Sequence, residues 1–490
     1  MLFNSVPFIF LFLPIVFIGY FVIIKSAPSK KASIIWLVIS SLFFYAFWNP
    51  MYIFLILSSI FVNYNIAKIF HANIDGKYKK IGVIAGVIFN VALLGYFKYV
   101  DFFIKNINGI FETDFALLYI MLPLAISFFT FQQIAFLVDN YRGEYEKNTF
   151  SSYALFVSFF PQLIAGPIVH HREMMPQFED ENNKNININN ISKGLFIFII
   201  GLTKKVGIAD TVAIWANTGF QNYESLSTID AWITSFSYTL QLYFDFSGYC
   251  DMAIGIALLF NIKLPINFLS PYKARNIQDF WKRWHITLSR FLTSYIYIPL
   301  GGNRKGEIRT YINIFIVFLI SGFWHGAGWT FVLWGIFHGI ASMAVRLWGI
   351  IGFKLPYWFS WIITFMFVNI TWVYFRATSI EQANTIISKM FQFNYNYNYP
   401  LSSFFQKPLK IFEAAGQYDF ILFKLDNPKI IVFTIITLLI ITFITKNSIQ
   451  LLDRFRTNIK TLLFSQVLLI GLVIIIFFIH KNSEFLYFNF

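Results

Sequence analysis

Two histidines in contrasting surroundings are the residues of this chain best suited to acid–base chemistry. His325 lies in the apolar run Ser321-Gly-Phe-Trp-His325-Gly-Ala-Gly-Trp329, and His285 follows the basic run Asp279-Phe-Trp-Lys-Arg-Trp. A titratable side chain in membrane-like sequence is expensive to bury and is therefore a functional candidate. An imidazole titrates near neutral pH, so it can remove a hydroxyl proton while that oxygen attacks a thioester carbonyl. The two histidines predict a proton-transfer centre suited to acyl transfer.

Carboxylates and lysines also interrupt apolar runs. Asp245 and Asp251 lie in such a run, and Gln241 shares a helix face with Asp245 at a spacing of four residues. Either aspartate can orient a histidine or pair with a buried Lys or Arg. Lys204 and Lys205 can anchor a helix end, extend their charge to the membrane surface or bind phosphate, and anchoring is favoured.

The segment 271–310 carries eight Lys and Arg residues against two acidic residues, so it is too charged to span a membrane. We expect a basic cytoplasmic or re-entrant segment. Within it, Phe280, Trp281, Trp284 and Leu288 recur at three- and four-residue steps, which predicts one amphipathic helix with His285 at the border of its apolar face.

The positive charge of this segment has two explanations. Lys282 and Arg283 are candidates for binding an anionic donor such as coenzyme A, as are Lys204 and Lys205. Attraction to anionic lipid accounts for the charge equally well. Trp281, Trp284 and Trp324 flank the histidines and are candidates for lining the site, together with Gln241, Asp245 and Asp251.

The composition defines a polytopic membrane protein. Of 490 residues, 57% are hydrophobic and 13% are charged, where soluble domains have about a quarter charged residues. About 11–12 hydrophobic segments are expected, some of them re-entrant or interfacial, in a single membrane-embedded domain covering 1–490. They lie near 6–24, 33–48, 51–70, 81–100, 116–138, 151–169, 193–215, 230–260, 311–345, 358–375, 429–445 and 464–480. The two longest runs contain Gly248, Gly255, Gly322, Gly326 and Gly328, which are candidate bends or breaks.

Several function classes are disfavoured. The net charge of +14 is typical of cytoplasmic loops of a membrane protein, so nucleic acid is not an expected partner. Cys250 is the single cysteine, which excludes an internal disulfide, and it is expected to be a small buried side chain rather than a nucleophile. No zinc-binding spacing, hydrolase elbow or P-loop is present, so no metal is expected.

Lys- and Arg-rich loops predict the orientation. The loops at 25–31, 77–80 and 446–460 are assigned to the cytoplasm, which places both termini outside. The stretch 376–428 is then an extracytoplasmic loop.

Three long motifs follow one another in the chain: Asp279-Phe-Trp-Lys-Arg-Trp-His285-Ile-Thr-Leu-Ser289, Tyr297-Ile-Pro-Leu-Gly-Gly-Asn-Arg304 and Phe323-Trp-His325-Gly-Ala-Gly-Trp329. They resemble the membrane-bound O-acyltransferase (MBOAT) family, and within it the bacterial alginate and peptidoglycan O-acetyltransferase type. The resemblance covers nearly the whole chain in order.

The resemblance implies a fold and a reaction. The fold is a ring of tilted helices around a central funnel. His325 matches the family's near-invariant histidine, the catalytic base, and His285 matches its second histidine, which positions the thioester or stabilises charge. Acetyl-CoA is the implied donor, taken from the cytoplasm across a bacterial inner membrane. An extracytoplasmic partner of the serine-hydrolase-like (SGNH) class then passes the acetyl group to a polysaccharide, with peptidoglycan weakly favoured over an alginate-like polymer.

Other functions remain open from the sequence. A D-alanyl transferase for teichoic acids, with a carrier-protein thioester as donor, belongs to the same family. A transporter or lipid flippase also buries Asp, Lys and His, and a non-catalytic scaffold would not need His325. His338 lies thirteen residues beyond His325, about 220° around a continuous helix, so we expect it to face elsewhere.

Overall fold

Lipid cannot hydrogen-bond the backbone, so an apolar chain of this kind must satisfy its peptide groups within helices. The computed structural model describes residues 1–26, 31–72, 75–144, 149–392, 428–474 and 485–486, and no strand occurs among them. The first half contains α1 (Leu13–Ser26), α2 (Lys31–Ala46), α3 (Tyr52–His71), α4 (Gly76–Leu94), α5 (Val100–Phe111), α6 (Ile126–Tyr141), α7 (Phe150–Ser158), α8 (Phe160–Leu163), α9 (His171–Glu179), α10 (Ile188–Leu202) and α11 (Asp210–Gln221). The second half contains α12 (Thr228–Leu259), α13 (Ile277–Trp281), α14 (Ile286–Leu292), α15 (Glu307–His325), α16 (Trp329–Ile351), α17 (Tyr357–Arg376), α18 (Ile380–Phe391), α21 (Pro428–Ile444), α22 (Ser448–Asp453) and α23 (Ile459–Ile474).

Seven of the described helical segments are long and apolar enough to cross a membrane. They are Phe8–Ser26, Tyr52–His71, Gly76–Phe111, Thr228–Leu259, Glu307–His325, Trp329–Ile351 and Tyr357–Arg376. Three shorter apolar helices, Lys31–Ala46, Lys429–Ile444 and Ile459–Val473, accompany them. The prediction of an all-helical polytopic membrane protein is confirmed. Most of the expected loop 376–428 lies outside the described residues.

Two expected runs are divided differently from the prediction. In the run 116–138, residues up to Pro123 form no regular secondary structure and α6 starts only at Ile126. The run 151–169 contains α7, the short α8 and then a loop, with Pro161 in the first turn of α8. Proline is accepted in the first turn of a helix and disrupts a helix interior, so Pro161 is compatible with the start of α8 but not with a continuation of α7.

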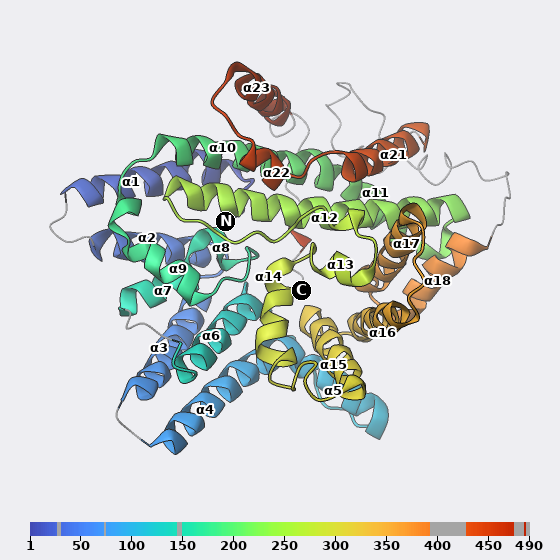
Figure 1. Ribbon diagram of the computed structural model, residues 1–490, viewed down its shortest axis with the longest axis horizontal. Coiled ribbons are helices and arrows are strands. Elements are labelled where there is room, and N and C mark those ends of the chain that lie inside the picture. The colour runs from blue at the N-terminus through green and yellow to red at the C-terminus, as the bar shows by residue number, and fades with distance from the viewer. Residues whose placement is uncertain (27–30, 73–74, 145–148, 393–427, 475–484, 487–490) are drawn as a thin grey trace.

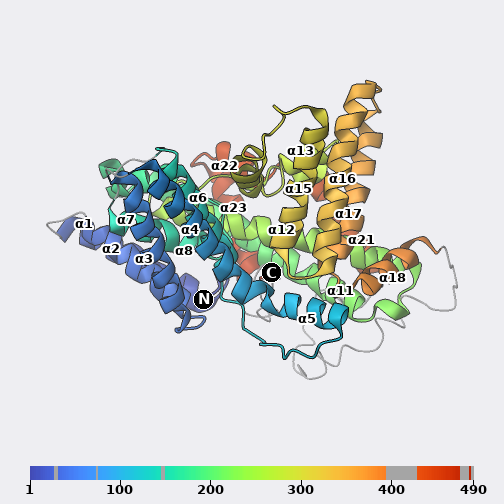
Figure 2. The same cartoon turned by 90° about the horizontal axis from the view of Figure 1, so that it is seen from below.

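Helix α12 is the central element of the molecule. It starts with a capping box in which Ser227 and Asp230 satisfy each other's backbone N–H groups, and it continues unbroken to Leu259. Every residue from Ser237 to Leu259 is buried. In Figure 1 it runs across the molecule beside α10, while α13 and α14 lie near the middle of the view. Figure 2 shows α15, α16 and α17 standing side by side at one end of the molecule, away from α1 to α3.

The expected break of α12 at Gly248 or Gly255 is wrong. These glycines instead allow close approach of α10: a Cβ on Gly255 would lie 2.6 Å from the carbonyl oxygen of Gly194, and one on Gly248 would lie 2.8 Å from that of Gly201. The order of the pairs shows that α10 and α12 run antiparallel. Small residues at such contacts let membrane helices pack backbone to backbone.

We predict that Gly201→Ala destabilises the protein, because the added methyl group would lie 2.6 Å from the Gly248 oxygen and 2.7 Å from the Met252 nitrogen. Overpacking of this kind costs about 1–3 kcal/mol. Thermal unfolding in detergent should shift to a lower temperature. Gly349→Ala is the matched control, because nothing lies within 4 Å of the Cβ position there. Equal unfolding temperatures for the two variants would contradict the close packing.

Candidate active site

His325 is the last residue of α15 and is 2% exposed. The chain then passes through Gly326 and Gly328 in extended conformation and starts α16 at Trp329. The expected break at these two glycines is therefore confirmed. A Cβ on Gly326 would lie 2.2 Å from the Phe331 ring, so this turn requires a residue without a side chain. Gly322, in contrast, stays helical and packs against Gly335 of α16.

His285 lies in the turn between α13 and α14 and is fully buried. Its backbone is left-handed, with φ of 44°, so α13 and α14 are two short helices. The expected single amphipathic helix through this region is wrong, although its predicted apolar members Phe280, Trp281, Trp284 and Leu288 are all buried. The periodicity arose from burial of both short helices and of the turn between them rather than from one continuous face.

Asn267 determines which nitrogen of His285 carries the proton. The Asn267 Oδ1 atom accepts the backbone N–H of Thr287 at 3.2 Å and the Thr287 hydroxyl at 2.9 Å. His285 Nδ1 lies 3.2 Å from the same oxygen and must donate to it, because a carbonyl oxygen only accepts. Nε2 is then the basic nitrogen of the neutral ring. The Asn267 amide nitrogen is 3.5 Å from the Cys250 sulfur, and Cys250 is buried as expected.

The ring of Trp324 contacts both histidines. Its centroid is 4.8 Å from that of His325 and 6.3 Å from that of His285. His325 also packs against Trp334 at 5.2 Å and Phe375 at 5.1 Å. The two histidines, separated in sequence, are thus brought to one aromatic site of low polarity, where electrostatic interactions are stronger than in water.

His338 lies closer to this site than expected. The angular prediction assumed a continuous helix, and it fails because α15 ends at His325. The His338 ring is 4.7 Å from Trp334, which also contacts His325. Its Nδ1 accepts from Trp281 Nε1 at 3.2 Å, and its Nε2 contacts the Thr371 hydroxyl at 3.1 Å. Both nitrogens therefore have structural hydrogen bonds.

The aspartates and lysines of the central helices form ion pairs. Asp251 pairs with Lys204 at 2.6 Å, and Asp245 pairs with Lys205 at 2.8 Å. The aspartates could have oriented a histidine or paired with a buried Lys or Arg, and in the structure both pair with lysine. Gln241 is buried on the same helix.

The two candidates for donor binding in the basic segment lie near the surface. Lys282 is exposed. Arg283 is partly buried and pairs with Asp279 at 2.8 Å. Both flank the buried His285 turn, as their sequence positions require.

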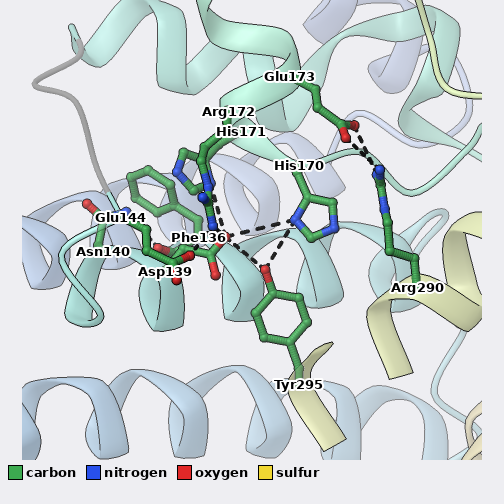
Figure 3. Close-up of polar contacts among 10 residues, drawn as sticks. All are labelled: Phe136, Asp139, Asn140, Glu144, His170, His171, Arg172, Glu173, Arg290 and Tyr295. Carbon is green, nitrogen blue, oxygen red and sulfur yellow. Dashed lines mark hydrogen bonds and ion pairs between the residues drawn. The ribbon is translucent and has the colours of Figure 1, made fainter. Parts of the chain in front are cut away.

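A second polar group, the Asp139 cluster, consists of Asp139, His170, His171, Arg172 and Tyr295 (Figure 3). The Tyr295 hydroxyl donates to Asp139 at 2.8 Å and lies 3.2 Å from His170 Nδ1. His171 and Arg172 approach the same carboxylate at 3.7 and 3.8 Å. Sequence reasoning missed this cluster, although an aspartate at the end of an apolar run and adjacent histidines were visible signals.

A row of aromatic rings connects the Asp139 cluster to the histidine site. Phe131 stacks on Trp324 at 4.9 Å and on Phe291 at 4.2 Å, and Phe291 packs against Tyr295 at 4.8 Å. Beside the cluster, Arg290 of α14 forms a two-pronged ion pair with Glu173 of α9, also shown in Figure 3. Helix α14 is thus fixed at its start by Asn267 and along its length by α6 and α9.

Sequence reasoning also missed Lys98 and Tyr99, which lie in the π-helical turn η2 (Gly95–Tyr99) between α4 and α5. The Lys98 ammonium donates to the carbonyl oxygen of Trp324 at 2.6 Å. A lysine within the apolar run 81–100 was the available signal, because charges in such runs are functional candidates.

The helical fold defines a multi-pass membrane protein, and comparison with known proteins defines its class as a membrane acyltransferase. The sequence model of the MBOAT, membrane-bound O-acyltransferase family, matches residues 145–382, which include both histidines. Over its whole length the chain is 49% identical to the peptidoglycan O-acetyltransferase of Helicobacter pylori and covers 98% of it.

More distant relatives share the family. The chain is 39% identical to the probable alginate O-acetylase AlgI of Pseudomonas syringae, over 80% of this chain and 76% of the relative. It is 25% identical to the teichoic acid D-alanyltransferase of Streptococcus thermophilus, over 46% of this chain and 57% of the relative. The chain belongs to the MBOAT family, and it is a multi-pass membrane O-acyltransferase.

The Asp139 cluster should make the stability of the folded protein depend on pH. Burial lowers the pKa of His171 to about 4, so its ring is neutral at pH 7. Burial alone would raise the pKa of Asp139, but the nearby His170 ring and the hydrogen bond from the Tyr295 hydroxyl outweigh it and hold that pKa below its ordinary value. An unfolded histidine titrates near pH ~6.5, so between about pH 6.5 and 4 the unfolded chain binds the extra proton and acid removes stability.

We therefore expect the unfolding temperature of the wild type to fall as the pH is lowered from 7.5 to 4.5, and that of His171→Phe to fall less. Phenylalanine suits the site because His171 packs edge-on against Phe136 and Phe156. The Asp139 carboxylate keeps its charge in this range, since its contribution is lost only at lower pH. His71→Gln is the control, at an exposed histidine whose Nε2 lies 3.2 Å from Asn140 Oδ1, because a glutamine amide can keep a hydrogen bond there. Parallel curves for wild type and His171→Phe would refute the assignment.

Proposed function

We propose that this enzyme takes acetyl groups from cytoplasmic acetyl-CoA and passes them across the bacterial inner membrane for O-acetylation of a cell-wall or exopolysaccharide polymer. The observation that carries the proposal is the meeting of His325 and His285 around Trp324 in a buried aromatic site. The relative that is named a peptidoglycan O-acetyltransferase favours peptidoglycan as the polymer.

His325 is proposed as the general base. Its imidazole takes the proton of an acceptor hydroxyl while the hydroxyl oxygen forms a bond to the thioester carbonyl carbon. The carbon–sulfur bond then breaks, and the thiolate of coenzyme A receives the proton from the imidazolium. The products are an acetyl ester and free coenzyme A, so no other reactant is required.

His285 is proposed to contribute as an acceptor of a hydrogen bond. Asn267 holds the proton on Nδ1, so the Nε2 atom of the neutral ring carries a lone pair. In this form the ring can orient the acceptor hydroxyl whose proton His325 takes, and it cannot donate a hydrogen bond to the thioester carbonyl through Nε2. Trp281, Trp284 and Trp324 are proposed to shape the surroundings and exclude water, which strengthens the electrostatic interactions of the reaction.

The donor and the partner follow from the same proposal. Lys282 and Arg283, beside the His285 turn, are proposed to attract the phosphates of coenzyme A. Lys204 and Lys205 are weaker candidates because each is already paired with an aspartate. An extracytoplasmic SGNH-type protein is proposed to receive the acetyl group and transfer it to the polysaccharide.

We predict that purified protein in nanodiscs releases coenzyme A from acetyl-CoA in the presence of membrane and wall extract as the source of acceptor. His325→Ala should lower the rate by about 100-fold or more, since general base catalysis contributes about 10²–10⁴-fold. His285→Ala should also lower it, and His285→Gln should recover part of the loss, because the glutamine amide oxygen can accept a hydrogen bond. Free coenzyme A measured with a thiol reagent reports the rate.

A D-alanyl carrier-protein thioester, supplied in place of acetyl-CoA, tests the alternative donor. His71→Gln serves as the control for loss of a histidine away from the site. Full activity of a folded His325→Ala variant would overturn the proposal. Turnover of the carrier-protein thioester without turnover of acetyl-CoA would also overturn it.

A further inference from the structure

The end of α15 is held by side chains from a distant part of the chain. The Lys98 ammonium lies 2.6 Å from the carbonyl oxygen of Trp324 and 3.2 Å from that of His325. The neighbouring Tyr99 hydroxyl donates to the carbonyl oxygen of Phe323 at 2.7 Å. These carbonyls belong to the last turn of the helix, where no backbone N–H is available within the helix.

The π-helical turn η2 brings both side chains to the same helix end. Isolated π-helical turns insert one additional residue in a helix and are frequent at functional sites. Here, the consecutive residues Lys98 and Tyr99 both reach the last turn of α15. The Tyr99 ring also stacks on Phe323 at 4.4 Å and 10° between ring planes, which keeps the two elements in register.

The surroundings of Lys98 match an ammonium group. Its third contact is the Ser127 hydroxyl at 3.3 Å, so three oxygen acceptors face its three N–H donors. Within the described residues Lys98 makes no ion pair, in contrast to Lys204 and Lys205. A cation at a helix C-terminus also interacts favourably with the helix dipole. The charge of Lys98 is therefore directed at the backbone of the His325 turn.

We propose that Lys98 is a positioning residue for acyl transfer, which fixes the C-terminal turn of α15 and with it the imidazole of His325. This inference depends on the proposed role of His325 as the base. Without the ammonium, the Trp324 and His325 carbonyls would lose their donor, and the last turn could unwind towards Gly326. Misplacement of a catalytic group by about 1 Å can reduce a rate by about 100-fold.

The test compares Lys98→Met, Lys98→Arg and Tyr99→Phe in nanodiscs, with acetyl-CoA as the donor and release of coenzyme A as the signal. Methionine keeps length and apolar bulk but has no donor. We expect Lys98→Met to lower kcat by about 10- to 100-fold, with the KM for acetyl-CoA changed less than about twofold. Lys98→Arg, which keeps a charged donor, should recover much of the loss, and Tyr99→Phe should lower kcat less than Lys98→Met.

Lys105→Met is the matched control, because Lys105 is exposed on α5 and lies outside the site. Unfolding temperatures of all variants are measured in parallel. Full activity of Lys98→Met would overturn the positioning role. A loss of kcat that matches an equal loss of folded protein would also overturn it, and so would a loss that Lys98→Arg does not restore. If His325→Ala is fully active, the proposed function fails instead, and the two failures are thus distinguished.

Discussion

A helix that ends inside a membrane protein leaves carbonyl groups that lipid cannot satisfy. Helix α15 ends at His325, and the groups that donate hydrogen bonds to its last carbonyl oxygens come from a turn far away in the sequence. This requirement links the N-terminal helices to His325, the proposed base. It also explains why an ammonium group can be accommodated between α4 and α15 without an ion pair among the described residues.

The two histidines are supported in different ways. His325 depends on capping of its own helix, whereas His285 depends on a left-handed turn and on the Asn267 side chain. The rings of Trp324, Phe131 and Phe291 then join both to the Asp139 cluster at the other end of α14. Rigid aromatic contacts of this kind position the histidines on packed elements rather than on free loops.

Features with local causes could be predicted from the sequence. The apolar runs predicted the helical membrane fold, and the glycines after His325 predicted the break between α15 and α16. The long motifs were sufficient to identify the family. The predictions that failed required knowledge of which segments pack together. Gly248 and Gly255 face α10, and the 280–288 pattern reflects burial of two short helices. The position of His338 was wrong because it assumed a continuous helix, whereas α15 ends at His325.

Contacts across the chain explain what the sequence could not show. Lys98 lies 226 residues before Trp324, so no local pattern indicates their hydrogen bond. Similarly, the aspartates of α12 could have oriented a histidine or paired with a lysine, and only the packing of α10 against α12 decides between them. Residue type indicated that these groups matter, and the fold determines what each one does.

The antiparallel packing of α10 and α12 has a consequence for how the protein is made. Lys204 and Lys205 follow α10, and their partners Asp251 and Asp245 lie on α12. Neither segment can enter lipid alone without exposing charge, at a cost of about 2.5–3.5 kcal/mol for each residue at the centre of a span. The two helices, with α11 between them, therefore gain most by entering the membrane together, when their charges are already paired and their glycines already in contact. Biogenesis of this enzyme would then be cooperative at the same pair of helices that supports its centre.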